Sequence, residues 1–335
     1  MVSINELIQQ YCKVSQLSEQ LSDRPIGSSG QISGSASTPE QYYQCQRHID
    51  IYDSPQLKNL ATQAAKDRQL RILPFVFNPL DDPLANPPAD KSPKQVPSTS
   101  SDPVSVRPSQ LQTYVANGAI PVCLYEDDYP GWLALDDLEF LQPIDRPALV
   151  PTWTAAEIGD RLPQIITYLK TAMAQPNEYL WGGVIGPNYD CSGLMQAAFR
   201  SQGIWLPRDA YQQEAFIQPV ELSDLAMGDL IFFGPKERAN HVALYLGDRH
   251  YIHSSGKTMG RNGIGIDSVP DNLPHTLSIN IFATSNSPPI KTTELADPIS
   301  QAYAKIIHGA GRVIASYQPQ GTPIKSIDSN VIPMI

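Results

Sequence analysis

Residues 188–194, Asn-Tyr-Asp-Cys-Ser-Gly-Leu, decide the fold, because they place a cysteine where a loop turns into a helix. An apolar run with helical spacing follows, and Gly203 is expected to end it as a C′ glycine. Cys191 is therefore predicted at a buried helix N-terminus, where unpaired N–H groups and the helix dipole favour an anion. Such a setting can lower the pKa of a thiol from ~8.5 to roughly 3.5–7.5 and can hold an oxyanion. A buried structural cysteine is the alternative, and this stretch alone does not choose between the two.

Residues 241–253, His-Val-Ala-Leu-Tyr-Leu-Gly-Asp-Arg-His-Tyr-Ile-His, predict a β-hairpin. The turn signal Gly247-Asp248 lies at its centre, and His241 and His253 each lie six residues from Gly247. In an antiparallel hairpin centred there, the two histidines are roughly cross-strand partners, with Cβ atoms about 4.5–5.5 Å apart. One imidazole can then act as a general base while the other orients it.

A zinc site is the alternative use of the same three residues, since one cysteine and two histidines form a known ligand set. Against zinc, no two of Cys191, His241 and His253 stand at short ligand spacing, and zinc does not explain a cysteine at a helix start. Alternation also predicts that Ala243 and Tyr245 share the face of His241. We therefore expect a nucleophile with its base, and no metal or other cofactor.

The residues around these two stretches predict an α+β order, with helices followed by an antiparallel run of strands. Thr154 and Glu157 have the spacing of a capping box and open a helix that is expected to reach about Gln175. Its predicted buried face consists of Ile158, Leu162, Ile165, Ile166 and Leu169. Strands are expected at 229–233, 241–246, 251–254, 265–269 and 279–284. Residues 298–316 predict one helix within a C-terminal extension, residues 286–335.

The first half of the chain predicts a small β-barrel over residues 42–145. Short strands are expected at 43–46, 49–52, 69–73, 120–125, 131–135 and 139–141, and 57–65 fits either a short helix or a strand. Residues 78–110 are rich in Pro, Ser and Asp and predict a long disordered insertion. Residues 1–41 predict an N-terminal extension, an amphipathic helix over 1–20 followed by a flexible lead-in.

Length, charge and cysteine content limit the classes of function. The chain has 335 residues, which favours about two domains, and its net charge of -10 argues against nucleic-acid and anionic-lipid partners. No apolar run approaches the roughly 18 residues of a membrane span. The N-terminus shows no secretory signal, so a cytoplasmic location is expected. The four cysteines lack the spacing of a disulfide framework and are expected as reduced thiols.

Six motifs resemble those of the NlpC-type cysteine peptidases, in the same order along residues 160–285. They are Tyr179-Leu-Trp-Gly-Gly183, Asp190-Cys-Ser-Gly193, Leu206-Pro-Arg-Asp209, Gly228-Asp-Leu-Ile-Phe-Phe233, His241-Val-Ala-Leu-Tyr-Leu-Gly247 and His253-Ser-Ser-Gly256. The resemblance implies a papain-like α+β domain over 155–285, with a Cys-His-His triad in place of Cys-His-Asn. It makes Cys191 the nucleophile, His241 the base and His253 the orienting residue. Tyr179 matches a tyrosine that assists at the oxyanion, and a packed aromatic is its alternative reading.

Residues 42–144 more faintly resemble the bacterial SH3-like barrel of one branch of that family, best over Glu-Asp-Asp-Tyr-Pro-Gly-Trp-Leu at 126–133. The resemblance implies a γ-D-glutamyl-L-diamino-acid endopeptidase of cell-wall turnover or recycling. Its substrate is a murein peptide such as L-Ala-γ-D-Glu-diaminopimelate with a free N-terminal L-Ala, because in that branch the barrel closes one end of the cleft. The insertion at 78–110 departs from a compact barrel.

The resemblance also implies a subsite for the peptide amino group, since a buried charge requires partners. Asp190 and Asp209 match its acidic positions and Tyr129 its tyrosine. The remaining expected substrate-binding residues lie in the same motifs and are Arg208, Trp181 and Ser192. Helix capping is the alternative for the two aspartates, and ordinary barrel surface is the alternative for Tyr129. The neighbouring acidic residues Glu126, Asp127 and Asp128 are expected to be solvated.

Three functions follow as hypotheses. The first is a hydrolase that cuts the bond between γ-D-Glu and diaminopimelate. The second is a non-catalytic protein that binds peptidoglycan through the barrel, and the intact triad argues against it. The third is an acyl or amide transferase on the same scaffold, which an added amine in the product would reveal.

Overall fold

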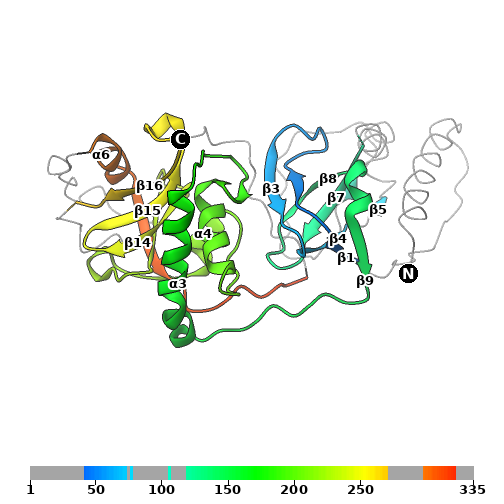
Figure 1. Ribbon diagram of the computed structural model, residues 1–335, viewed down its shortest axis with the longest axis horizontal. Coiled ribbons are helices and arrows are strands. Elements are labelled where there is room, and N and C mark those ends of the chain that lie inside the picture. Colours follow the sequence, from blue (N-terminus) through cyan, green and yellow to red (C-terminus); the bar gives the residue numbers. More distant parts are fainter. Residues whose placement is uncertain (1–40, 74–75, 78–104, 107–117, 271–296, 322–335) are drawn as a thin grey trace, which may run out of the picture. The chain divides into compact units, whose positions relative to one another are not determined.

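The computed structural model describes residues 41–73, 76–77, 105–106, 118–270 and 297–321 (Figure 1). The contacts divide the chain into two compact units. The first unit runs to Pro147, except that residues 60–63 and 126–129 join the second unit together with everything from Ala148 onward. The expected helix at 1–20, the lead-in at 21–40 and the strand at 279–284 lie outside the described residues. Within these ranges, the structure has no helix of the length and apolarity that a bilayer crossing requires.

The first unit is built on a seven-stranded sheet in the order β3-β2-β8-β7-β4-β1-β9. Its strands are β1 (Tyr42–Cys45), β2 (Ile49–Tyr52), β3 (Leu60–Ala64), β4 (Gln69–Ile72), β7 (Ala119–Leu124), β8 (Pro130–Ala134) and β9 (Leu141–Ile144). The expected strands are thus confirmed, and the ambiguous stretch 57–65 forms a strand. The expected strand at 139–141 is wrong in part, because Leu135–Phe140 forms a 3-10 helix and β9 begins only at Leu141. The SH3-like identity of this unit stays a prediction.

The Pro-rich stretch 78–110 contains one described element. Ser105–Val106 (β6) pairs in parallel with Val76–Phe77 (β5) as a two-residue ladder. The prediction of disorder is therefore wrong for these two residues. Their backbones pair with residues far away in the sequence, and local composition does not reveal such a pairing. The remainder of 78–110 lies outside the described residues.

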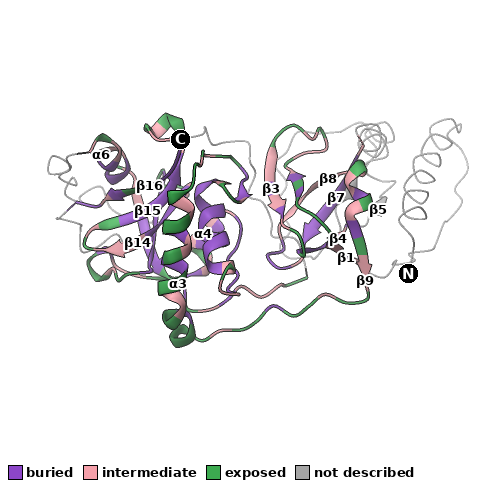
Figure 2. Cartoon of the chain, in the orientation of Figure 1, coloured by how far each residue is buried: buried purple, intermediate pink, exposed green. Residues whose placement is uncertain are grey.

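Two helices of the second unit form as the sequence predicts. Helix α3 (Ala155–Ala174) begins with the capping box, in which the Thr154 backbone N–H donates to Glu157 at 2.8 Å. Ile158, Ile165, Ile166 and Leu169 are buried as predicted, with Leu162 partly buried against the same core. Figure 2 accordingly shows α3 as exposed on one side, whereas α4 is buried almost throughout.

Helix α4 (Cys191–Arg200) ends in a Schellman motif, which explains its stop at the expected glycine. Gly203 takes a φ of 74°, and its N–H donates to the carbonyl of Arg200 at 2.9 Å. The N–H of Ile204 reaches back to the carbonyl of Phe199 at 3.1 Å. A short helix, α5 (Ala210–Phe216), follows, and Asp209 is its N-cap, as the alternative reading of that aspartate requires.

The second unit contains a six-stranded sheet in the order β12-β17-β13-β14-β15-β16, antiparallel throughout. Its strands are β12 (Gln218–Pro219), β13 (Leu230–Phe233), β14 (His241–Gly247), β15 (His250–Ser255), β16 (Gly263–Ser268) and β17 (Ile307–Arg312). The small elements around it are β10 (Val184–Ile185), β11 (Asn188–Tyr189) and the 3-10 helices Leu222–Asp224 and Lys257–Met259. The predicted α+β order with an antiparallel run of strands is confirmed.

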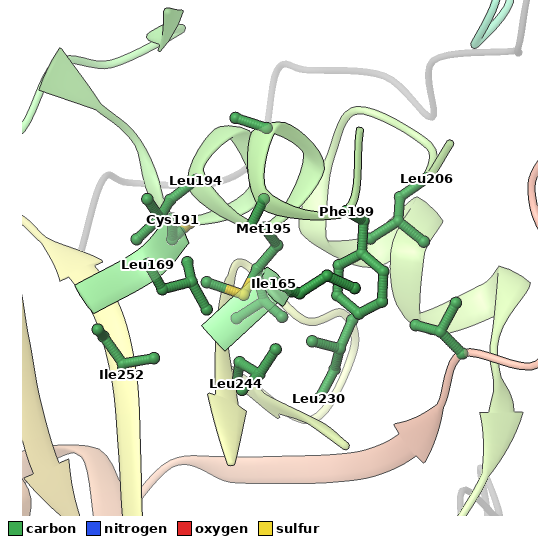
Figure 3. Packing of buried hydrophobic residues seen from close by; sticks show 14 of the residues in the cluster. Ile165, Leu169, Cys191, Leu194, Met195, Phe199, Leu206, Leu230, Leu244 and Ile252 are labelled. Carbon is green, nitrogen blue, oxygen red and sulfur yellow. The ribbon is translucent and has the colours of Figure 1, made fainter. Parts of the chain in front are cut away.

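Alternation along the strands gives this sheet two apolar faces. Leu230, Leu244 and Ile252 face α3 and α4 and form the main core (Figure 3). Ala243 and Tyr251 point the other way, into a smaller cluster that includes Tyr303. Because both faces are covered, the strands are buried along most of their length.

The expected single helix over 298–316 is wrong. The chain forms the short helix α6 (Pro298–Ala304) and then β17, which lies between β12 and β13 within the sheet. Two glycines in β17 disfavour a helix, and the ladder with β13 supplies the backbone partners. A Cβ on Gly311 would meet the side chain of Ile217, so close packing also requires a glycine there. The segment expected as an appendage is therefore part of this sheet.

The predicted hairpin forms with the correct faces, but its register differs from the expected one. Tyr245 pairs with Tyr251 and Leu244 with Ile252, and an irregularity precedes Gly247. The turn is made by Asp248 and Arg249, which both have positive φ, as a type I′ turn requires. Extending this register puts His253 opposite Ala243 rather than opposite His241. The two histidines are thus diagonal neighbours on one face, still within reach of each other.

Candidate active site

Cys191 is the first residue of α4, as predicted, and Asp190 is the N-cap whose carboxylate accepts from the Gly193 N–H at 2.6 Å. The thiol is 5% exposed and borders the main core (Figure 3). Its sulfur donates to the carbonyl of Asn240 at 3.9 Å and accepts from the backbone N–H of Val242. The sulfur therefore contacts the backbone on both sides of His241, where β14 begins.

The pKa of the Cys191 thiol moves opposite to the expected direction. Burial, followed by the charge of Asp190, raises it to about 12. The N–H groups of Val242 and Ser192 act in the lowering direction, but loss of solvation outweighs them. The expectation of a thiolate held by the helix terminus is corrected for this reason, and the resting nucleophile is a neutral thiol.

The two histidines and a carboxylate form a hydrogen-bonded chain. His241 Nε2 lies 2.7 Å from His253 Nδ1, and His253 Nε2 lies 2.6 Å from Asp267 Oδ2. A carboxylate only accepts, so His253 carries its proton on Nε2 and accepts at Nδ1 from the Nε2–H of His241. The Nδ1 of His241 then keeps its lone pair, as a general base requires.

Both imidazoles are neutral at rest. Burial and then the neighbouring His253 hold the pKa of His241 well below its usual value. Burial also lowers the pKa of His253, although the hydrogen bond and charge of Asp267 oppose this. A neutral thiol beside a neutral base is thus the resting state, and the proton must move during the reaction.

Asp267, Arg261 and Tyr303 also belong to this site, although no motif in the sequence marks them. Asp267 lies on β16, where an expected strand placed it without a role, and its other oxygen accepts from Arg261 at 2.5 Å. Tyr303 of α6 covers the histidines, with its ring centroid 4.6 Å from that of His241 and 4.8 Å from that of His253. Its hydroxyl lies 2.7 Å from that of Ser255. Local sequence gave no signal for Tyr303, because β17 and α6 reach the sheet across a long separation.

Tyr179 and Trp181 lie in the loop that precedes α4. Tyr179 is half-buried, and its pKa is raised by burial and then by the nearby Cys191 thiol, so its ring lies close to the nucleophile. Trp181 is 56% exposed. The structure thus brings Tyr179 to the site as predicted by the resemblance, while the roles of both residues stay predictions.

Asp190, Arg208 and Ser192 form a buried polar network beneath the start of α4. Arg208 binds Asp190 in a bidentate manner, with distances of 3.1 and 2.6 Å, and donates to the Ser192 hydroxyl at 3.0 Å. Asp190 also accepts from the N–H of Gly182 at 2.9 Å. Both oxygens of Asp190 are therefore engaged, so the alternative reading of this residue as a helix cap is confirmed. Its contact with substrate stays a prediction.

Asp209 and Tyr129 are brought together within the second unit. The Tyr129 hydroxyl donates to Asp209 Oδ1 at 3.3 Å, and Asp209 is the N-cap residue of α5. Burial raises the pKa of Asp209 to about 6, and the charge of Arg208 acts in the lowering direction. Burial raises the pKa of Tyr129 well above its usual value. Tyr129 is thus not an isolated surface residue.

The expectation that the neighbouring acidic residues are solvated is wrong. Glu126, Asp127 and Asp128 are all buried. Asp127 accepts from the side-chain amide of Gln196 at 2.8 Å, and Asp128 accepts from the hydroxyl of Tyr317 at 3.1 Å. These partners come from α4 and the C-terminal segment, which a local reading of 126–128 does not include.

A shared metal ion does not fit between the facing nitrogens of the two histidines. Zinc–nitrogen bonds of about 2.0–2.1 Å in a tetrahedral site hold two ligand nitrogens farther apart than the observed 2.7 Å. In the described part of the chain, no group of three or more His, Cys, Asp or Glu residues is arranged to hold a metal. Cys45, Cys123 and Cys191 carry reduced thiols, and Cys12 lies outside the described residues.

Comparison with known proteins gives a match for part of the second unit. Residues 176–275 match the NlpC/P60 family. A Bacillus subtilis (strain 168) relative, Gamma-D-glutamyl-L-lysine dipeptidyl-peptidase, is 42% identical over 86 residues, which make up 24% of this chain and 29% of the relative. An Escherichia coli (strain K12) relative, Murein DD-endopeptidase MepS/Murein LD-carboxypeptidase, is 38% identical over 78 residues, 23% of this chain and 42% of the relative. The matched part thus spans less than half of either relative.

A solved structure of an NlpC/P60 family protein from Bacillus cereus ATCC 10987 is 20% identical to this chain. The match covers 82% of this chain and 64% of the Bacillus cereus chain. Its TM-score is 0.34, which is too low to support an argument about the fold. Both relatives are named as peptidases, and the name of the Escherichia coli relative refers to murein.

Proposed function

We propose that this chain is a cysteine peptidase that hydrolyses murein peptides, and the match of residues 176–275 to the NlpC/P60 family supports this. One observation supports it above the others. A cysteine at a helix start lies beside the first residue of β14, and that residue, His241, begins a hydrogen-bonded chain to His253 and Asp267. Nucleophile, base and orienting group then occur in the order that such catalysis requires.

In the proposed reaction, Nδ1 of His241 takes the thiol proton as the sulfur attacks the peptide carbonyl. Loss of the proton and attack occur together, because burial disfavours a standing thiolate. The departing amine takes the proton from His241, leaving a thioester on Cys191. Water then attacks this thioester and gives a proton to His241. As the carbon–sulfur bond breaks, His241 returns this proton to the sulfur, which restores the thiol and releases the acid product. Backbone N–H groups at the start of α4, with the hydroxyl of Tyr179, are proposed to hold the oxyanion.

The finer proposal concerns the bond that is cut. We assign the bond between γ-D-Glu and diaminopimelate in peptides with a free N-terminal L-Ala. The name of the Bacillus subtilis relative refers to a γ-D-glutamyl bond, although to L-lysine. Asp209 is the carboxylate proposed to bind the amino group, because the charge of Asp190 is already matched by Arg208. We propose that Trp181, Ser192 and Tyr129 belong to the same subsite. The SH3-like identity of residues 42–145 and a cytoplasmic location are further parts of the proposal.

Two synthetic peptides test this function, L-Ala-γ-D-Glu-diaminopimelate with its amino group free and the same peptide acetylated. We expect release of the dipeptide L-Ala-D-Glu from the free form and at least about tenfold slower cleavage of the acetylated form, since an unpaired buried carboxylate is costly. Mass spectrometry of the products provides the measurement. Equal cleavage of both peptides would contradict the amine subsite, and binding of sacculi without cleavage would contradict the enzyme.

The pH dependence of kcat/KM separates Asp209 from the catalytic base. The pKa of Asp209 is raised to about 6, so as the pH falls through this value its carboxylate is protonated and loses its attraction for the ammonium group. We expect the acidic limb for the free peptide to have its midpoint near that pH. In Asp209→Asn the limb should shift to lower pH, because the pKa of His241 lies well below its usual value. An unchanged midpoint in this variant would exclude Asp209 as its origin.

A further inference from the structure

We propose that Asp267 and Arg261 form a positioning pair that fixes the proton positions of both histidines, and thereby makes Nδ1 of His241 available as the base. This inference deepens the proposed function and rests on it. The pair acts through His253 and touches no reacting atom, so both residues are positioning residues. Neither lies in a motif that carried the family resemblance.

Asp267 is a buried carboxylate that bridges His253 and Arg261 and also meets the side chain of Asp297. Its side chain is 1% exposed, and one oxygen lies 2.6 Å from His253 Nε2 while the other lies 2.5 Å from Arg261 Nη2. A carboxylate removed from water requires such partners to remain charged. The guanidinium of Arg261, itself 25% exposed, therefore keeps Asp267 an acceptor toward His253.

The sheet leaves room for the arginine at one position. Gly265 pairs with His253 across β15 and β16. A Cβ on Gly265 would collide with the guanidinium of Arg261. The space beside His253 is thus occupied by the charged head of Arg261 because residue 265 has no side chain. The absence of a side chain at residue 265 therefore allows Arg261 to pack beside the strand that carries His253.

The charge of Asp267 determines which atom donates in each of the two hydrogen bonds, the one between Asp267 and His253 and the one between His253 and His241. It demands Nε2–H on His253, which leaves His253 Nδ1 as an acceptor and places the proton of His241 on Nε2. A neutral asparagine can instead donate its amide N–H to His253 Nε2. The proton of His253 would then sit on Nδ1 and that of His241 on Nδ1, which blocks the atom that must accept the thiol proton. The same reversal underlies the large effect of an Asp-to-Asn change in serine protease triads.

Other titratable groups also face this pair, and their titration contributes to the pH dependence of kcat. Asp297, the N-cap of α6, lies within hydrogen-bond reach of Asp267 and acts electrostatically on His253. Its carboxylate accepts from the N–H of Ser300 at 2.8 Å. Tyr303 and Tyr251 pack their rings against His253, and burial raises the pKa of both hydroxyls. Among these groups, Asp267 alone is hydrogen-bonded to an imidazole.

The decisive variant is Asp267→Asn, compared with Asp229→Asn as a matched control. Asp229, directly before β13, is likewise a buried carboxylate paired with an arginine, Arg312 of β17, at 2.7 Å, and its described hydrogen bonds include neither histidine. We expect kcat to fall by about 10²–10⁴-fold in Asp267→Asn with KM little changed, and by less than about threefold in the control. Equal losses in both variants would mean that any buried Asp–Arg pair has this effect, and would overturn the proposal.

Histidine ring NMR gives a readout that needs no activity. In the wild-type protein we expect proton signals on Nε2 of both rings, and in Asp267→Asn a shift of both protons to Nδ1. A wild-type His253 protonated on Nδ1 would overturn the proposal. If Asp267→Asn fails to fold, Arg261→Gln is the second variant, with an expected loss in kcat of about tenfold and a partial change of tautomer. Wild-type protein that shows the expected tautomers but cleaves no murein peptide would refute the function and leave the positioning pair intact.

Discussion

Replacement of Cys191 by alanine is expected to lower kcat/KM for murein-peptide cleavage by at least about 10⁴-fold, since it removes the atom that forms the covalent intermediate. The fold should persist, because the thiol makes only weak hydrogen bonds and Asp190 still caps α4. Product release followed by mass spectrometry measures the loss, and thermal unfolding checks the fold. Cleavage by Cys191→Ala at more than about a tenth of the wild-type rate would refute the mechanism.

Cys123→Ala is the matched control for this prediction. Cys123 is also a fully buried thiol, and it donates to a backbone carbonyl, Leu124 O, at 3.6 Å. It lies on β7 in the first unit, so its loss should cost stability comparable to that of Cys191 without affecting catalysis. If both variants lost activity equally, the effect would be one of folding rather than of chemistry.

A further readout of Cys191 is its reactivity. Because its pKa is raised to about 12, alkylation by iodoacetamide in the absence of substrate should be slow at neutral pH and should accelerate as the pH rises. In contrast, a standing thiolate would react at a rate that hardly changes above neutral pH. This comparison tests the corrected direction of the shift against the one that the helix terminus alone predicts.

Elements whose signals are local could be predicted from the sequence. The capping box at Thr154 and the C′ glycine at Gly203 depend on residues within one helical turn, and both formed as expected. The face shared by His241 and His253 follows from alternation along each strand. Their register did not follow, because the turn residues Asp248 and Arg249 adopt positive φ one step beyond the expected centre.

Elements that depend on distant partners could not be predicted. The C-terminal strand β17 contains Gly309 and Gly311 and has little strand character of its own, and its place in the sheet depends on β13. Tyr303 reaches the histidines because α6 packs against β16, where the N–H of Ser268 donates to the Ser300 hydroxyl. The pKa of Cys191 was predicted in the wrong direction for a related reason, since burial depends on the whole fold while the helix dipole is local.

The chemistry-bearing residues fall between these two cases. Cys191, His241 and His253 lie at positions that motif spacing marks, and the structure connects the two histidines and places the sulfur beside the start of β14. Asp267 lies within a correctly expected strand, yet its role needs the pairing of β15 with β16, which brings it near His253. Which strands pair is decided by the whole sheet, so the sequence of β16 alone does not predict that Asp267 lies near His253.

Replacement of Arg208 by methionine is expected to destabilise the second unit by about 3–5 kcal/mol, because it leaves the buried carboxylate of Asp190 without its cation. Arg208 is 1% exposed and provides two of the hydrogen bonds that Asp190 accepts. Methionine keeps much of the side-chain volume, so the loss reports on the charge more than on packing. Urea unfolding followed by tryptophan fluorescence provides the measurement, since Trp153, Trp181 and Trp205 lie in this unit.

The double variant Arg208→Met with Asp190→Asn distinguishes a buried charge from a lost contact. Asparagine caps a helix about as well as aspartate, so the Gly193 N–H keeps an acceptor while the unpaired charge disappears. We expect the double variant to regain at least about half of the stability that Arg208→Met loses. Without that recovery, the cost would belong to the packing of the arginine. If the stability recovers, the start of α4 is held by an ion pair whose charges cancel. Asp209 then remains the carboxylate that is proposed to bind a substrate ammonium group.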